Sequence, residues 1–321
     1  MISVPCPRYV FLFALLGLSP AVVLAEQAGG SVSLGYRVDS LDWNINGGSG
    51  GPNILSELEW KDMDILQFRG ELSGSNYTGI YFRGQVNYGW VLDGVNRDSD
   101  YAGNNRTLEF SRSVNSVDDS KVLDLSGGLG LTFYAGEAEQ WRIIPMVGYS
   151  YHQQDLRMSN GNQVLWDSAN ADLLGVGGGP VPLGPFGGLS SSYDAEWYGP
   201  WLGADIFLDL PARGTVFMRL EAHRVSYFAQ ANWNLRSDFA QPVSFEHEAN
   251  AWGGVWELGW QGVPSSTHWV WGASIVIQSW ATGSGIDRIF YADGGVGVAT
   301  LNEVNWSSSS VNFTLRKALD N

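Results

Sequence analysis

The stretch YTGIYFRGQVNYGWVL, from Tyr77 to Leu92, alternates between two kinds of side chain over its whole length. One face carries apolar and aromatic residues such as Phe82, Val86 and Trp90, and the other carries Arg83 and amides. A period of two is typical of a β-strand whose two sides meet different environments. At about 3.3 Å per residue, the stretch is long enough to cross a hydrocarbon core of about 30 Å. It therefore predicts a membrane-spanning strand with lipid outside and a polar lumen inside.

The start of the chain has the features of a secretory signal peptide. Arg8 precedes an apolar run from Tyr9 to Leu18, and small residues ending at Ala25 follow. We expect residues 1–25 to be removed and residues 26–321 to form one outer-membrane domain. No later segment approaches 18 consecutive apolar residues. A membrane-embedded chain must then be a closed barrel, because only a helix or a barrel satisfies every backbone group in lipid.

Composition excludes several classes of function. The single cysteine, Cys6, lies within the expected signal peptide, so we expect no disulfide and no thiolate chemistry in the mature chain. Loss of Arg8 with the signal leaves 17 basic and 33 acidic residues, a balance that argues against nucleic acid as a partner. The 15 tryptophans and 41 glycines, with 16% charged residues, fit an aromatic-girdled barrel better than a globular enzyme.

The alternating pattern recurs along the chain. We expect ten strands, at residues 31–45, 54–72, 77–92, 121–134, 141–156, 195–210, 215–228, 251–260, 269–280 and 304–315. Four short turns and five long loops join them in strict alternation. This predicts an all-β fold: a ten-stranded antiparallel transmembrane β-barrel with short periplasmic turns and long extracellular loops.

Ionisable residues of both signs share one face of these strands. They are Arg83, Asp124, Arg142, Asp205, Asp209, Arg219, Glu221, His223 and Glu257. In a small barrel they would form a paired network in an interior that holds little water. A soluble lipocalin-like barrel would need the reverse arrangement, with the large aromatics inside and the polar residues outside. The charged face therefore favours a bacterial outer-membrane barrel.

The chain resembles the omptin family of outer-membrane proteins. The resemblance rests on the ten-strand, five-loop plan, on LSELEWK in the second strand, on Gly89-Trp90 in the third, and on Asp98-Ser99-Asp100-Tyr101 after it. Omptins are endopeptidases in which an aspartate pair faces an aspartate-histidine dyad at the extracellular rim, with a water between them as the nucleophile. The resemblance implies Asp98 and Asp100 as catalytic residues. Paired carboxylates can share a proton, although both could equally be solvated loop residues.

The dyad has no direct match. In the loop after the seventh expected strand, His247 follows Glu246, and Phe245 stands where an aspartate would be expected. Glu246 would point away from His247 in an extended chain. Glu221 and His223 form an alternative dyad on one lumenal face, where an ion pair with Arg219 is the competing role. The scattered histidines could also form a metal site with nearby carboxylates, but no spacing typical of metal ligands is present in the sequence.

These observations leave three hypotheses. The first is an integral outer-membrane barrel with a structural or interaction role and a lumen filled by its own charges. The second is an omptin-type aspartic endopeptidase that cleaves cationic peptides at an acidic rim. The third is a narrow porin. We expect no cofactor and no metal. The expected partner is outer-membrane lipid, with lipopolysaccharide as a further partner or activator by analogy with omptins.

Overall fold

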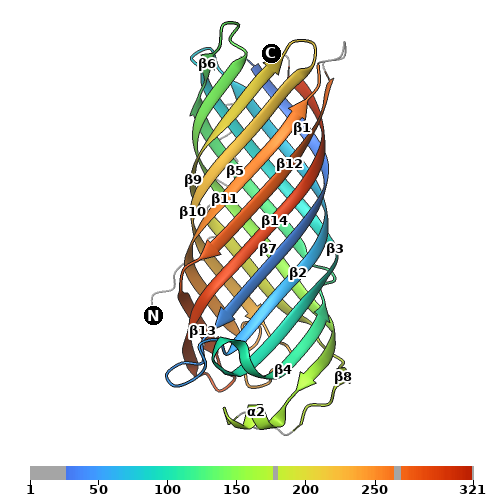
Figure 1. The fold of residues 1–321 in the computed structure, drawn as a ribbon, viewed down its shortest axis with the longest axis vertical. Helices are drawn as coiled ribbons and strands as arrows, with labels where there is room; N and C mark the ends of the chain where they lie inside the picture. Colours follow the sequence, from blue (N-terminus) through green and yellow to red (C-terminus); the bar gives the residue numbers. More distant parts are fainter. Residues whose placement is uncertain (1–26, 176–179, 264–268, 320–321) are drawn as a thin grey trace.

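The computed structural model describes residues 27–175, 180–263 and 269–319, and the expected signal peptide lies outside them. These residues form a long antiparallel barrel with little helix, which confirms the predicted fold class (Figure 1). Among the described residues, no helix is long and apolar enough to cross a membrane.

Ten strands make up the ring. They are β1 (Gln27–Ile45), β2 (Ser56–Ser75), β3 (Ile80–Gly103), β5 (Lys121–Leu131), β7 (Trp141–Trp166), β9 (Ser191–Leu210), β10 (Gly214–Asn232), β11 (Phe245–Gln261), β12 (Trp269–Thr282) and β14 (Val296–Leu319). Each pairs antiparallel with its neighbours, and β1 pairs with β14 from Ala28 and Leu319 to Ile45 and Leu301. This last pairing closes the barrel, so the sheet has no long free edge.

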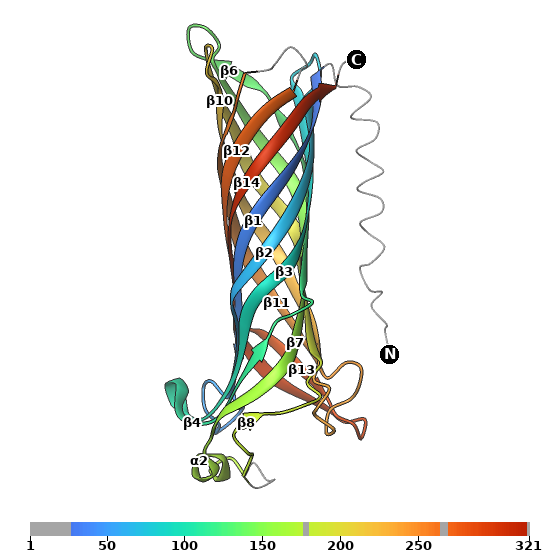
Figure 2. The same cartoon turned by 90° about the vertical axis from the view of Figure 1, so that its right-hand side faces the viewer.

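Short elements extend or interrupt the ring. They are β4 (Thr107–Ser116), β6 (Phe133–Ala135), β8 (Gly184–Pro185), β13 (Gly285–Phe290), the 3-10 helix η2 (Asn104–Arg106) and α2 (Ser168–Asp172). β4, β8, β13 and α2 all lie at one end of the barrel, whereas β6, the end of β14 and the short turns 76–79 and 211–213 lie at the other (Figures 1 and 2). The end with the long connections is extracellular and the end with the short turns is periplasmic, as in other barrels of this kind.

The strands continue far beyond the predicted limits at the extracellular end. The expected loop after Leu92 is wrong, because β3 runs on to Gly103, turns through η2 and returns as β4. β7 likewise continues ten residues past Leu156. The cause is that the apolar outer face exists only where lipid covers the barrel. Beyond Leu92, β3 carries polar residues on both faces, such as Arg97 outside and Asn96 and Asp98 inside, and the period that reveals a strand in the sequence disappears.

Within the membrane the predicted faces are confirmed. On β9, Leu202 is 65% exposed toward lipid, while its neighbour Trp201 is buried inside at 2%. On β10, Arg219, Glu221 and His223 all point into the lumen and are buried. In β2 the expected alternation blurs at Lys61 to Asp64, because the register with β3 shifts there and Asp62 adopts a positive φ of 51°.

Candidate functional site

The aspartate pair lies on β3 in the extracellular part of the barrel. Asp98 pairs in register with Leu58, and Asp100 pairs with Ser56. Because directly opposed residues share a face, and Leu58 is 1% exposed in the barrel core, both aspartates face the interior. The strand therefore supplies the one-residue spacing that points two carboxylates in the same direction.

The surroundings of the aspartate pair disfavour ionisation of both carboxyl groups at once. Burial raises the pKa of Asp98 well above its ordinary value, and the neighbouring Asp100 carboxylate raises it further. Burial likewise raises the pKa of Asp100 to about 6, although a hydrogen bond with Ser56 opposes the shift. Arg236, in the connection between β10 and β11, acts on both carboxyls in the opposite direction. The two groups therefore hold a proton near neutral pH more readily than isolated aspartates do.

His247 lies on β11 and is fully buried. Its Nδ1 is 2.8 Å from the hydroxyl of Tyr193, and its Nε2 is 3.5 Å from Oδ1 of Asp287 on β13. His247 and Asp287 are directly opposed in register, so the sheet itself builds a histidine-carboxylate pair. Sequence reasoning missed Asp287, because its partner is 40 residues away and only the β11–β13 pairing brings the two together.

Glu246 points to the other face of β11, as expected for the neighbour of an inward residue. Its Oε1 accepts a hydrogen bond of 2.8 Å from Nε2 of Gln230, and its Oε2 is 3.5 Å from Nη1 of Arg288. The structure therefore places Glu246 on the outer surface, away from the interior that His247 faces.

An aromatic layer fills the interior around His247. We use this name for Trp43, Trp60, Tyr193 and Phe245, all buried. Tyr193 stacks on Trp60 with ring centroids 5.2 Å apart, and the rings of Trp43 and His247 form a T-shaped pair with centroids 4.8 Å apart. Among the described residues no hydrogen bond or ion pair joins either aspartate to His247. The aspartate pair and the histidine thus face the same interior, with tryptophan and tyrosine rings packed against the histidine.

The alternative dyad lies deeper, in the membrane-spanning part. His223 Nε2 is 3.0 Å from Oε2 of Glu221, and Ser150 Oγ is 3.1 Å from His223 Nδ1. Ala229 on β10 is the register partner of His247. His223 lies six residues before Ala229 on the same strand, a separation of about 20 Å along the strand. The two candidate histidines therefore belong to different levels of the barrel.

The expected ion pair between Glu221 and Arg219 is wrong, because each of the two residues pairs with a different group. Glu221 binds Arg83 on β3. Arg219 instead places Nη1 2.6 Å from Glu71 and 3.1 Å from Glu257. The reason is geometric: Glu257 is the register partner of Arg219 on β11, and its carboxylate lies within direct reach.

The charged network predicted for the lumen is present. Arg69 is 2.9 Å from Glu257, and Arg37 is 2.6 Å from Asp124, which also meets Nδ1 of His152 at 3.0 Å. A small polar cavity of about 20 Å³ lies among these groups, which is about the space of one water molecule. At this level, charged side chains from opposite walls meet across the lumen.

Within the part of the chain that the structure describes, no group of three or more histidine, cysteine, aspartate or glutamate side chains could hold a metal ion.

The closed ring, its apolar outer wall and its charged interior define an integral outer-membrane β-barrel protein. A family model described as Pom, Protochlamydia outer membrane protein, matches residues 31–319, and the chain belongs to this family. No curated protein matches the chain in sequence.

The fold is similar to that of the outer membrane protease OmpT from Escherichia coli. The TM-score is 0.66 with 11% identity, over 92% of this chain and 97% of that chain. This confirms the omptin-like architecture, and at this identity it shows the fold alone. The translocator domain of the autotransporter NalP from Neisseria meningitidis aligns with a TM-score of 0.36 and 10% identity, over 96% of this chain and 94% of that chain. OprG from Pseudomonas aeruginosa aligns at 0.33 and 10%, over 91% and 96%. Both TM-scores are too low to support a structural argument.

Proposed function

We propose that this protein is a sealed outer-membrane barrel with a structural or interaction role, whose extracellular strands and loops present an acidic surface. The observation that carries the proposal is the filling of the lumen at two levels. Ion pairs such as Arg219 with Glu71 fill the membrane-spanning part, and the aromatic layer fills the interior above it. A ten-stranded barrel leaves little free lumen once such side chains project inward. Ligand contacts would then be made by the outer end.

Conductance measurements test the sealed lumen. The refolded mature chain, inserted in planar lipid bilayers, should give no single-channel steps. Discrete steps in the wild-type protein would instead support the narrow porin. As a positive control, the variant Arg219→Ala with Glu71→Ala should remove side chains from both walls and produce steps if the barrel remains folded.

The second candidate is an omptin-type aspartic endopeptidase. It is favoured by the carboxyl pair Asp98 and Asp100, which faces the same interior as the pair of His247 and Asp287. In this proposal His247, oriented by Asp287, would act as the base on a water, and the proton-sharing aspartates would act opposite it. Glu246 on the outer face, and Glu221 with His223 deep in the lumen, would have supporting roles at most.

Peptide cleavage separates the two candidates. The refolded chain, with and without lipopolysaccharide as an activator, would be incubated with peptides that contain paired basic residues. Cleavage abolished by Asp98→Asn with Asp100→Asn, and by His247→Gln, would establish the endopeptidase. The sealed structural barrel predicts no cleavage in either condition, with folding verified by circular dichroism.

The proposal includes secretion and removal of residues 1–25. Arg8 and the apolar run after it motivate this step. N-terminal sequencing of the protein from outer membranes should begin at Glu26, and a retained Met1 would contradict it.

A further inference from the structure

The extracellular end of β14 has an open edge. Residues 296–300 of β14 pair with β13 on one side, at the end of the barrel where β13 lies (Figure 1). On the other side their neighbour in the ring would be β1, but β1 ends at Ile45, which pairs with Leu301. Among the described residues, no strand takes the place of β1 beyond this point.

The backbone groups of Val296 and Val298 point toward the open side. Successive residues of a strand direct their N–H and C=O groups to opposite neighbours, so residues two apart share a direction. The carbonyl of Thr300 accepts a hydrogen bond of 3.0 Å from the N–H of Asn46, on the side of β1. Val298 and Val296 direct their groups to the same side, where the described chain offers them no backbone partner.

The loop after β1 leaves this edge uncovered. Asn302 donates a hydrogen bond of 2.9 Å from Nδ2 to the carbonyl of Asn53, so the loop meets β14 on the membrane side of residues 296–300. The N–H of Asn53 is in turn 2.9 Å from Oδ1 of Asn104 in η2, which holds the loop toward β3. The side chains of Val296 and Val298 remain 58% and 71% exposed.

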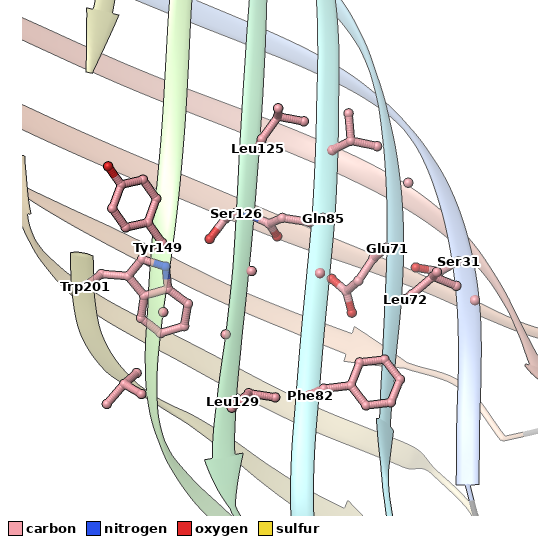
Figure 3. Close-up of a pocket in the computed structure, with 18 of the residues that line it drawn as sticks. Ser31, Glu71, Leu72, Phe82, Gln85, Leu125, Ser126, Leu129, Tyr149 and Trp201 are labelled. Carbon is pink, nitrogen blue, oxygen red and sulfur yellow. The ribbon is translucent and has the colours of Figure 1, made fainter. Parts of the chain in front are cut away.

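Lipid does not account for these valines, which are an exception to the polar outer face beyond the membrane. Figure 3 shows the membrane-spanning wall, where outward side chains such as Leu129 face lipid. Arg224 lies 4.7 Å over the ring of Trp252 at the extracellular limit of that wall. The row of Glu246 and Val298, which are joined through β13, crosses β11 six residues beyond Trp252, or about 20 Å along the strand.

The edge also lacks the features that normally protect an open strand. Natural edge strands are blunted by lysine, proline or a β-bulge. The segment VGVAT, from Val296 to Thr300, has no charge and no proline, and its register with β13 is uninterrupted. A strand of this kind is a template on which an extended chain can add.

The surroundings of the edge are acidic. The nearest cation, Arg288 on β13, is already balanced by two carboxylates, with Nη1 3.5 Å from Glu246 and 3.3 Å from Glu248. Below the edge, Glu303 on β14 and Asp42 on β1 share the outer wall. Burial raises the pKa of Asp42, and the carboxylate of Glu303 is among those that raise it further. Positive charge on a bound chain would relieve this repulsion.

A second copy of this chain does not fit the edge. Two copies in one membrane are related by an axis along the membrane normal, so β14 runs from the extracellular to the periplasmic end in both. Their tilted strands would cross instead of pairing antiparallel. The acidic flanks of the two edges would also repel each other.

We propose that the open edge of β14 binds an extended, cationic segment of another protein by addition of a β-strand. The segment exchanges backbone hydrogen bonds with Val296 and Val298, and its lysine or arginine side chains meet Glu303 and Asp42. This inference rests on the proposed interaction role, to which it assigns a surface and a class of partner.

A display library of short random segments, panned against the refolded chain in lipid nanodiscs, tests the proposal. We expect the enriched segments to be rich in lysine, arginine and β-branched residues. Val298→Pro removes the N–H that faces the open edge and leaves the pairing with β13 in place. It should weaken binding of an enriched synthetic peptide about tenfold, as measured by fluorescence anisotropy. Val298→Thr is the matched control, because it keeps the N–H and the β-branched shape, and it should bind like the wild type.

Amide hydrogen exchange gives a direct measurement of strand addition. Exchange of residues 296–300, followed by mass spectrometry, should slow when the peptide is bound. Unchanged exchange there, equal binding to Val298→Pro and Val298→Thr, enrichment of acidic segments, or no enrichment would each overturn the proposal. If Val298→Pro does not fold, Val296→Pro and Val296→Thr replace the pair.

The outcomes separate this inference from the proposed function. Peptides that bind Val298→Pro as tightly as the wild type would support an interaction role elsewhere on the outer end and overturn the β14 edge alone. Single-channel steps would refute the sealed lumen without any bearing on the edge. A dimer that Val298→Pro dissociates would assign the edge to a second copy of the chain and overturn the proposed partner.

Discussion

The barrel interior is built in two different ways at its two levels. In the membrane-spanning part, buried arginines and carboxylates such as Arg83 and Glu221 meet across the lumen. In the extracellular part, the aromatic layer packs around His247, and few charges are buried. Removal of a charge from the first level leaves its partner without compensation, whereas a change in the second level removes only packing or a hydrogen bond. The two levels should therefore respond to substitution very differently.

The largest loss of stability is expected in the membrane-spanning part, where the interior is filled by ion pairs. Arg219→Met would leave the buried Glu71 and Glu257 with Arg69 as their remaining close cation. Breaking a buried ion pair in this way costs about 3 to 5 kcal/mol, which urea unfolding followed by tryptophan fluorescence would measure. Arg142→Gln is the control, because Arg142 and Asp209 are about one-third and one-half exposed and lie 3.5 Å apart, so the loss should stay below about 1 kcal/mol. Equal losses would contradict the proposed difference.

In the aromatic layer, Tyr193→Phe should cause a smaller loss of stability. The Tyr193 hydroxyl is within hydrogen-bond reach of both Tyr227 and Nδ1 of His247. Its loss leaves buried polar atoms without a partner, which costs about 2 kcal/mol, while the ring still packs on Trp60. The same unfolding experiment measures this loss. A cost as large as that of Arg219→Met would remove the distinction between the two levels.

The smallest effect on stability is expected from the aspartate pair, and this effect depends on pH. Because burial raises the folded-state pKa of Asp98 and Asp100, folding favours their protonated forms. The contribution of Asp100 is therefore full below about pH 4, the unfolded value, and is lost as pH rises through about 6, and the contribution of Asp98 is lost in the same direction. The double variant Asp98→Asn, Asp100→Asn should lack this decline and be more stable than the wild type at pH 8 by about 1 to 2 kcal/mol.

Unfolding at a series of pH values checks this expectation. Asp118→Asn, at an exposed position, is the control and should keep the wild-type decline. A double variant that is less stable than the wild type at pH 8 would show that both carboxylates are charged and stabilising, which is the opposite of the expected effect.

The sequence predicted the membrane-spanning level well. The alternation around Arg83 identified a lumenal face, and the same face on β10 gave Arg219, Glu221 and His223 as buried groups. The sequence could not show which of these groups form ion pairs with one another, because partners such as Glu71 and Arg219 are separated by 148 residues. Which carboxylate each arginine reaches depends on the register and diameter of the closed ring.

At the extracellular level the sequence was less informative. Asp98 and Asp100 were singled out by their resemblance to the omptin aspartate pair, but their placement in a loop was wrong because the outer face there has no lipid to impose a pattern. The Asp287 partner of His247 depends on β13 pairing with β11. No local signal in the sequence marks that pairing.

The ion pairs of the lumen also constrain how the barrel is made. Arg69 and Glu257 are 188 residues apart, on β2 and β11, and Arg37 on β1 reaches Asp124 on β5. A half-assembled sheet in the membrane would hold these charges without partners, at a cost of several kcal/mol each. Insertion and ring closure must therefore be cooperative, and the finished barrel resists opening strand by strand.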